Sequence, residues 1–274
     1  MSNVNIEVFP IAKTQVDREA VRQWLDHVGA TGYEIPDASV ASDPALLIAL
    51  AAKRCYMSFE AGLNPNVTRV RSNMVEYIDN ILASGHGSVL EHSVYSFAIE
   101  GVSRVFTAEM NRHRAGWAIS EGSMRFIRFE DDIPWWMPTS ITFRDDDDED
   151  LRSRKTRSQV LFYKAFAQDQ ENYAEFLKIW DMKEGDHNFT YKKKVTSCGR
   201  RIIGIGVATG GVWTGNFRAL RHVLTMRASD AAEEEIFHVF AEKIGPMMIE
   251  AEPLLLGDFH STATGALEPK YRKV

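Results

Sequence analysis

Two stretches of the 274-residue chain gather side chains that bind anions or transfer protons. The first runs from His86 to Arg125 and places eleven such residues within forty positions. Residues 112–114 form an Arg-His-Arg triplet, whose charges repel one another unless an anion lies against them. This spacing favours a small-anion site over the alternative, a basic surface patch neutralised by neighbouring glutamates. The polar residues of the stretch are His86, Glu91, His92, Arg104, Glu109, Arg112, His113, Arg114, Glu121, Ser123 and Arg125.

The second stretch, residues 215–229, has the apolar spacing of a helix and carries further arginines. On a continuous helix Asn216 and Arg227 share one face about 16 Å apart, whereas Arg218 lies nearly opposite Arg227. One helix can therefore address two ligands, or two parts of a large ligand. The alternative is a helix whose arginines, including Arg221, face solvent.

Other chemistries fit the sequence poorly. Cys55 and Cys198 have no Cys-x-x-Cys spacing, and His86 and His92 are badly spaced for a helical metal pair, so we expect no metal site. The glycine-rich residues 204–211 place their third glycine one position late for a dinucleotide loop, and we assign them to strand and turn. We interpret the six acids of residues 145–150 as a solvated loop.

The composition of the chain limits the kinds of partner that it is expected to bind. A net charge of −6 and an ordinary 45% hydrophobic content indicate a globular chain without an extended nucleic-acid or membrane footprint. No apolar stretch is long enough to cross a bilayer, and residues 1–10 carry no export signal. We expect one domain over residues 1–274, in the reducing cytoplasm.

Hydrophobic periodicity predicts the elements that must position these residues. Period-two alternation predicts strands over residues 95–101 and 124–129. Helical spacing predicts a further helix from Ser103 toward Arg112. The other expected helices span residues 17–28, 45–52 after an N-cap at Ser42, 67–81 closed by Gly85, 151–180 and 231–249.

The two polar stretches together resemble the flavin-dependent thymidylate synthases. The matching residues are the run from His86 to His92, the triplet at 112–114, Ser123 with Arg125, and residues 215–229. The resemblance implies an α/β fold with a helix-flanked antiparallel sheet, in a homotetramer whose active sites lie between subunits. It further implies bound FAD, NADPH as reductant, and 5,10-methylenetetrahydrofolate as carbon donor for C5 methylation of a uridylate.

By this resemblance, specific residues acquire roles. Arg227 orients and polarises the uracil ring, which stabilises charge developing as C5 becomes nucleophilic. The residues implied to bind the substrate are Glu109, Arg112, Glu121, Gly122, Ser123, Arg125, Arg200 and Arg227. Those implied to bind the flavin are Ser58, His86, Ser88, Glu91, Arg112, His113, Arg114, Glu121, Asn216, Arg218 and His222.

Two departures from the family pattern bear on the substrate. Residues 115–122 contain one residue more than the family has between the triplet and its serine. Glu109 replaces a glutamine, and a carboxylate there repels phosphate unless it is protonated or paired, for example with Arg112 or Arg200. The hypothesis is that UMP is accepted with dUMP, as in the UMP/dUMP methylases of nucleoside-antibiotic biosynthesis. The alternatives are a strictly dUMP-specific enzyme and a non-catalytic nucleotide- or RNA-binding protein.

We predict that Cys198→Ala retains substantial methylation activity, because the resemblance implies activation by Arg227 rather than by a thiolate. The measurement is tritium release from C5-labelled nucleotide. Complete loss of activity, with folding and flavin content intact, would instead indicate a nucleophilic cysteine.

Overall fold

The computed structural model describes residues 2–274, which form two compact units. The α5 unit comprises residues 2–8, 98–112 and 119–212, and the α7 unit comprises residues 9–97, 113–118 and 213–274. The expected fold class is confirmed in its coarser form, a mixed fold of helices and antiparallel sheet.

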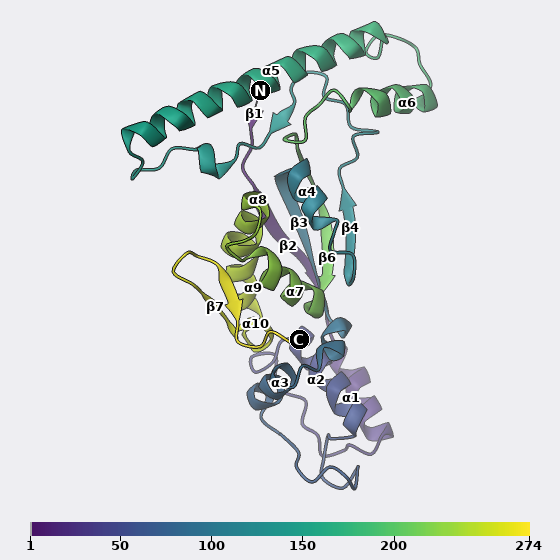
Figure 1. Cartoon of the computed structure of the whole chain (residues 1–274). Coiled ribbons are helices and arrows are strands. Elements are labelled where there is room, and N and C mark those ends of the chain that lie inside the picture. The colour runs from purple at the N-terminus through teal and green to yellow at the C-terminus, as the bar shows by residue number, and fades with distance from the viewer. Residues whose placement is uncertain (1) are drawn as a thin grey trace. The chain divides into compact units, whose positions relative to one another are not determined.

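A four-stranded sheet has the strand order β2-β3-β6-β4 (Figure 1). Residues Tyr95, Phe97 and Ile99 are buried as their alternation predicts, but β3 continues past Gly101. This glycine has a φ of +77°, and a Cβ there would overlap the carbonyl of Asn5, so the position tolerates no side chain. The strands are β2 (Glu7–Lys13), β3 (Val94–Ser103), β6 (Ala208–Asn216) and β4 (Trp117–Glu121).

The prediction of a strand over residues 124–129 is wrong. Ser123 begins a turn there: its hydroxyl accepts from the Arg125 backbone N–H, and its carbonyl accepts from the N–H groups of Phe126 and Ile127. Local bonding of this kind competes with a sheet ladder. The strand of this region is β4, in residues for which the sequence shows no clear period.

Helices of the α7 unit follow the predicted apolar spacing, with shifted ends. The 67–81 helix begins only at Met74, because the Asn73 side chain caps it by accepting from the Glu76 N–H. The 231–249 helix begins at Glu234 and contains a π-helical segment before Pro246, which has no N–H to donate. The helices are α1 (Arg18–His27), α2 (Asp43–Tyr56), α3 (Met74–Ala83), η1 (Gly87–His92), α7 (Phe217–Arg227), α8 (Glu234–Phe237), η3 (His238–Ile244), α9 (Gly245–Ala251) and α10 (Pro253–Leu256), with the hairpin β7 (Phe259–Ser261) and β8 (Leu267–Pro269).

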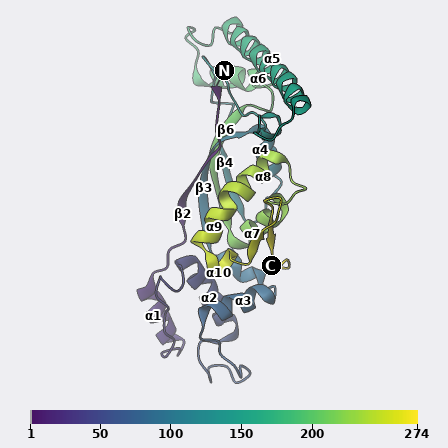
Figure 2. The same cartoon turned by 90° about the vertical axis from the view of Figure 1, so that its left-hand side faces the viewer.

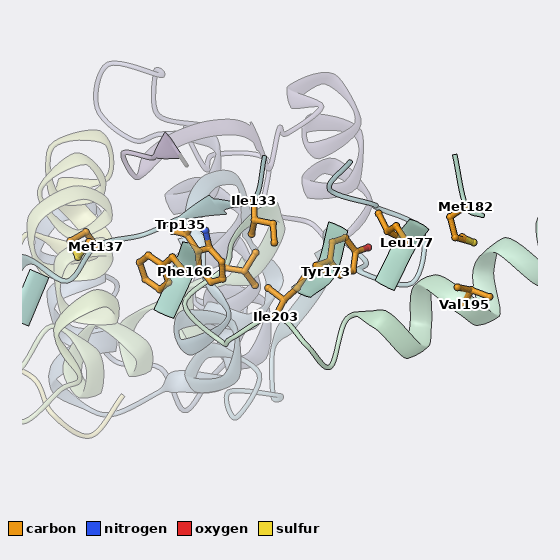
Figure 3. Close-up of a cluster of buried hydrophobic side chains, with 10 residues drawn as sticks. Ile133, Trp135, Met137, Phe166, Tyr173, Leu177, Met182, Val195 and Ile203 are labelled. Atoms are coloured by element: carbon orange, nitrogen blue, oxygen red, sulfur yellow. The ribbon is translucent and has the colours of Figure 1, made fainter. Parts of the chain in front are cut away.

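In the α5 unit a long helix packs over a buried cluster of aromatic and aliphatic side chains. Trp135 stacks face to face on Phe166, with ring centroids 4.1 Å apart, and Tyr173 and Leu177 continue the apolar face (Figure 3). Figure 2 also shows that α6 of this unit lies beside α5. The elements are β1 (Ser2–Asn3) parallel to β5 (Pro134–Trp135), α4 (Arg104–Met110), η2 (Thr139–Ile141), α5 (Glu149–Ile179) and α6 (Phe189–Gly199).

The acidic run is not simply a solvated loop. Asp148 caps α5 by accepting from the Leu151 N–H, and Glu149 and Asp150 form its first turn, where negative charge complements the helix dipole. Asp147 is buried against the Lys155 ammonium, at 2.7 and 2.8 Å, and this hydrogen bond lowers the pKa of the carboxyl. The run therefore starts a helix.

Lys53 on α2 is a buried cation held without a carboxylate partner in the described hydrogen bonds. Its Nζ donates to the carbonyl oxygens of Ser58, at 3.3 Å, and Arg71, at 2.9 Å. The ammonium also lies 4.3 Å from the centroid of the Tyr77 ring. The Lys53 side chain thus binds two points of the irregular segment between α2 and α3. Burial of the ammonium lowers the pKa of Lys53 to about 8.

This lowered pKa predicts an unusual pH dependence of stability. Between about pH 8 and 10.5 the unfolded chain binds more protons at Lys53 than the folded chain, so the contribution of Lys53 to stability rises with pH. We expect the difference in Tm between wild type and Lys53→Met to shift in favour of wild type from about pH 8 to about pH 9.5. A shift in the opposite direction would mean that folding raises the pKa of Lys53.

Candidate active site

A pocket of about 320 Å³ in the α7 unit brings together four residues expected to bind the cofactor. Glu91 comes from η1, and the other three come from the end of β6 and from α7, far from η1 in sequence. Arg218 and His222 are four positions apart on α7 and so lie on one helix face. The lining residues are Glu91, Ala115, Gly116, Asn216, Arg218, Ala219, His222 and Val274.

Local structure fixes the start of α7 at this pocket. The Asn216 side chain accepts a 2.8 Å hydrogen bond from the Ala219 N–H and thereby caps the helix. Gly116 has a φ of +76°, and a Cβ there would meet the Asn216 amide nitrogen at 2.8 Å and the Ala219 Cβ at 2.7 Å. The pocket therefore requires glycine at this position.

Arg218 forms an ion pair with Glu91 at 2.6 Å, and both side chains are about half exposed. An ion pair at such a site contributes little to stability, so its partners can reorganise around a ligand at small cost. Gly87 lets η1 approach, because a Cβ there would lie 3.0 Å from the Arg218 Nε.

Other predicted cofactor residues of this unit do not line the pocket. His86 stacks on Tyr56, with ring centroids 5.9 Å apart, Ser88 is exposed on η1, and Ser58 is held through its carbonyl by Lys53. Arg114 is exposed and His113 is half-buried, while Arg112, in the α5 unit, is exposed.

A side-chain cluster at the end of α7 joins the two sequence motifs. The Nε of Arg227 donates to the Nε2 of His113 at 2.8 Å. The rings of His113 and His222 meet edge to face, with centroids 5.7 Å apart. Arg227 is absent from the pocket lining, as expected for a residue opposite Arg218 on the helix.

Arg221, which the sequence groups with these arginines, has a different role. It is 2% exposed and makes a double ion pair with Asp258, at 2.5 and 2.8 Å, while also donating to the Leu255 carbonyl. This arginine is therefore part of the core and faces neither solvent nor the pocket.

The α5 unit contains a second pocket, of about 420 Å³, that is rich in arginine. It brings together four residues expected to bind the substrate, from the end of β4 and the end of α6. Arg125 is not among them, because it is exposed and lies 6.0 Å from the Phe126 ring. The lining residues are Arg104, Glu121, Gly122, Ser123, Met124, Arg200 and Arg201.

Arg104 is a site residue to which the sequence assigned no role. Its Nη1 lies 3.0 Å from Glu121, and its Nη2 donates to the Gly122 carbonyl. The Arg104 Nε and the second Glu121 oxygen are buried and have no hydrogen-bond partner among the described residues. Unmet polar atoms at a pocket wall favour a polar ligand. The sequence feature that could have identified Arg104 is its position directly after Ser103, the residue that caps α4.

A larger cavity of about 580 Å³ shares Arg104, Glu121 and Gly122 with the arginine-rich pocket. Its remaining walls are largely apolar and include Phe129 and Ile127. A ligand held by its anionic end at the arginines can therefore extend an uncharged ring into this cavity.

Two expectations from spacing can now be compared with the structure. Glu109 lies 3.6 Å from Arg112, so the carboxylate is paired with one of the two partners expected for it. Residues 204–211 lead into β6, and a Cβ at Gly210 would overlap the Glu100 carboxylate. Strand packing thus accounts for this glycine, and the strand-and-turn assignment is confirmed.

Residues 2–274 lack two further kinds of feature. No group of three or more His, Cys, Asp or Glu side chains is placed to hold a metal ion. None of the described helices is both long and apolar enough to cross a membrane.

Comparison with known proteins decides the family. The profile of the family described as thymidylate synthase complementing protein, Thy1, matches residues 38–254. The chain belongs to this family. It is 32% identical over 228 residues to the flavin-dependent thymidylate synthase of Mycolicibacterium vanbaalenii, covering 82% of this chain and 84% of that one. The Corynebacterium glutamicum enzyme of the same name is 32% identical over 216 residues, 78% of each chain.

Solved structures support the fold. The UMP/dUMP methylase PolB from Streptomyces cacaoi, bound with 5-Br dUMP, superposes with a TM-score of 0.61 at 16% identity, over 94% of this chain and 96% of that one. The same protein bound with 5-Br UMP gives a TM-score of 0.60 at 15% identity, over 92% of each chain. The expected resemblance and the assignment as an enzyme are both confirmed, and the relatives' names support a flavin as cofactor.

Gly116→Ala is predicted to reduce flavin uptake, because its methyl group collides with Asn216 and Ala219 at the pocket wall. The matched control is Gly265→Ala, which also has a positive φ, of +86°, but no neighbouring atom within 4 Å. Backbone strain of about 1 kcal/mol lowers Tm in both variants. Bound flavin per folded chain should fall only in Gly116→Ala; an equal fall in both would attribute the effect to strain.

Proposed function

We propose that this chain catalyses FAD-dependent reductive C5 methylation of dUMP and UMP. 5,10-Methylenetetrahydrofolate would supply the carbon, and NADPH the reducing equivalents. The observation that carries the proposal is the convergence of Glu91, Asn216, Arg218 and His222 on one pocket, in a chain of the Thy1 family.

The residues of this pocket fit part of a flavin dinucleotide. The Arg218 guanidinium suits phosphate oxygens, and the Asn216 amide and His222 imidazole suit the polar edge of a ring system. Gly116 and Gly87 keep the pocket open where a Cβ would intrude. When bound, the flavin would supply the hydride that reduces the transferred carbon unit to a methyl group.

The arginine-rich pocket of the α5 unit is the proposed phosphate site. Arg104, Arg200 and Arg201 contribute three guanidinium groups against the single carboxylate of Glu121, and Ser123 adds a hydroxyl. The C-terminal end of α6, where Arg200 lies, itself favours cations, which explains how arginines gather there. The adjoining cavity offers room for a nucleoside.

In this proposal Arg227 polarises a uracil carbonyl and so stabilises negative charge as C5 attacks the carbon donor. No thiolate is required. Cys55 and Cys198 are both exposed free cysteines and line none of the pockets described here. Their unpaired state agrees with the proposed cytoplasmic location.

Acceptance of UMP is the finer part of the proposal. Pairing of Glu109 with Arg112 removes the objection that a carboxylate would repel the phosphate. The additional residue between the triplet and Ser123 alters the segment bordering the proposed nucleotide site. A protein of similar fold is described as a UMP/dUMP methylase, which favours the same range of substrates here.

A homotetramer with shared active sites is also proposed. Along α5, Leu161 is 67% exposed and Ile179 is 70% exposed, an apolar display that a subunit contact would cover. The reaction needs flavin and nucleotide in one active site, and assembly between subunits would provide it.

The test of the activity is tritium release from C5-labelled dUMP and UMP, with methylene donor and NADPH present. We expect both nucleotides to release tritium well above the rate without enzyme. Release from dUMP alone would indicate a strictly dUMP-specific thymidylate synthase.

Arg200→Gln, which removes one phosphate-binding charge, should raise KM for nucleotide about tenfold or more with a smaller change in kcat. The control is Arg157→Gln, because Arg157 is an exposed residue of α5 that lines neither pocket. The non-catalytic alternative predicts a colourless protein that takes up no FAD but shifts RNA in a gel.

A further inference from the structure

We infer that His113 is the positioning residue for Arg227, holding its guanidinium in the orientation that acts on the uracil. This inference rests on the proposed function, because it concerns the residue expected to polarise the base. It also differs from the role that the family resemblance implies for His113, which is contact with the flavin.

The contact itself is specific. Arg227 is the last residue of α7, where the helix no longer restrains a long side chain. Its Nε donates to the Nε2 of His113 at 2.8 Å, within the normal range for such a bond. Because Nε lies next to the side-chain stem, this bond sets the plane of the guanidinium and the direction of both terminal nitrogens.

The direction of donation determines the state of the histidine. The Nε of arginine can only donate, so the Nε2 of His113 must accept and cannot carry a proton. The ring is therefore neutral, with its hydrogen on Nδ1. A protonated His113 would place two donors and two positive charges against each other, and the contact would be lost.

The contact between Arg227 and the neutral His113 ring differs from the contacts of the other two arginines of α7. Arg218 pairs with Glu91, and Arg221 pairs with Asp258, so in each case the orienting group is a carboxylate. The contact with His113 orients the guanidinium without adding negative charge, which suits a residue that must stabilise an electron-rich carbonyl.

His113 is itself held in place. It is half-buried, and its ring meets His222 edge to face at 5.7 Å. His222 lies five residues before Arg227 on α7 and also lines the cofactor pocket. The two histidine rings therefore connect the pocket wall to Arg227. A ligand that moves His222 can alter the position of Arg227 through one intermediate side chain, His113.

The experiment compares two substitutions that differ in reach. In His113→Gln the side-chain oxygen reaches the region of Nε2 and can accept from Arg227, whereas in His113→Asn it reaches only the region of Nδ1. We expect His113→Asn to lower kcat about 10- to 100-fold and His113→Gln to recover much of that loss. Flavin affinity, measured by titrating the apoprotein with FAD, should change little in either. His260→Asn and His260→Gln, at an exposed position on β7, are the matched controls.

A double substitution tests the coupling. Arg227→Lys removes Nε, so adding His113→Asn to it should cost little further activity, far less than the product of the two single effects. Multiplying effects would overturn the inference. So would a loss of FAD affinity in both His113 variants that accounts for the loss of kcat, since that outcome assigns His113 to the flavin instead.

A readout independent of turnover separates this inference from the proposed function. In the ¹⁵N spectrum of the wild-type holoenzyme, His113 should show a protonated Nδ1 and an unprotonated Nε2, and the Arg227 Nε–H should exchange slowly with water. In His113→Asn that exchange should accelerate. If wild type releases no tritium from either nucleotide, the proposed function fails while these spectra still test the contact; the opposite tautomer overturns it.

Discussion

Burial of Arg221 is the constraint on which the arrangement of α7 depends. The guanidinium is enclosed by Asp258 and the Leu255 carbonyl, and it also donates to the Tyr271 carbonyl at 3.3 Å. Removing one partner of a buried pair costs about 3–5 kcal/mol, because the remaining charge stays desolvated. With Arg221 and the apolar residues of α7 turned into the core, the polar residues at 218, 222 and 227 are left on the other faces. Rotation of the helix is thus fixed by a residue that takes no part in the proposed chemistry.

In both the cofactor pocket and the arginine-rich pocket, an arginine is balanced by a nearby glutamate. Arg104 and Arg218, one in each pocket, are paired with a glutamate that lines the same pocket. Such partners limit repulsion among the cations when no ligand is present. They also leave further guanidinium N–H groups for an anion, because a single carboxylate contact uses only part of the fork. The net charge of −6 is therefore compatible with an excess of cations in the arginine-rich pocket.

Long, regular features could be predicted from the sequence, and short ones could not. The helices at α1 and α5 and the cap at Ser42 followed from apolar spacing and side-chain chemistry, which act locally. The strand expected after Ser123 failed because six alternating residues look the same in a strand and in a half-exposed turn. Hydrogen bonds accepted by a single serine, Ser123, favour the turn.

The site was predictable as two groups of residues but not in its contacts. Motif resemblance identified four residues in the lining of the cofactor pocket and four in that of the arginine-rich pocket, yet the pairing of Arg227 with His113 joins positions that no spacing rule connects. The role of Arg104 was not predicted, for a related reason. A lone arginine at a helix start is common, and only the fold shows that it meets the end of β4.

The additional residue between the triplet and Ser123 has a definite physical consequence. Successive side chains of a strand point to opposite faces, so one inserted residue in β4 would turn Glu121 away from Arg104 unless a neighbouring turn absorbs it. Burial along β4 alternates without interruption from Trp117 to Glu121, as in a strand that contains no bulge. This pattern favours an end of β4 as the place that accommodates the additional residue. Gly116, with its positive φ, is suited to this at the start of the strand. An additional residue placed at Gly116 would leave the Arg104–Glu121 pair in register and would change the wall of the cofactor pocket that Gly116 lines.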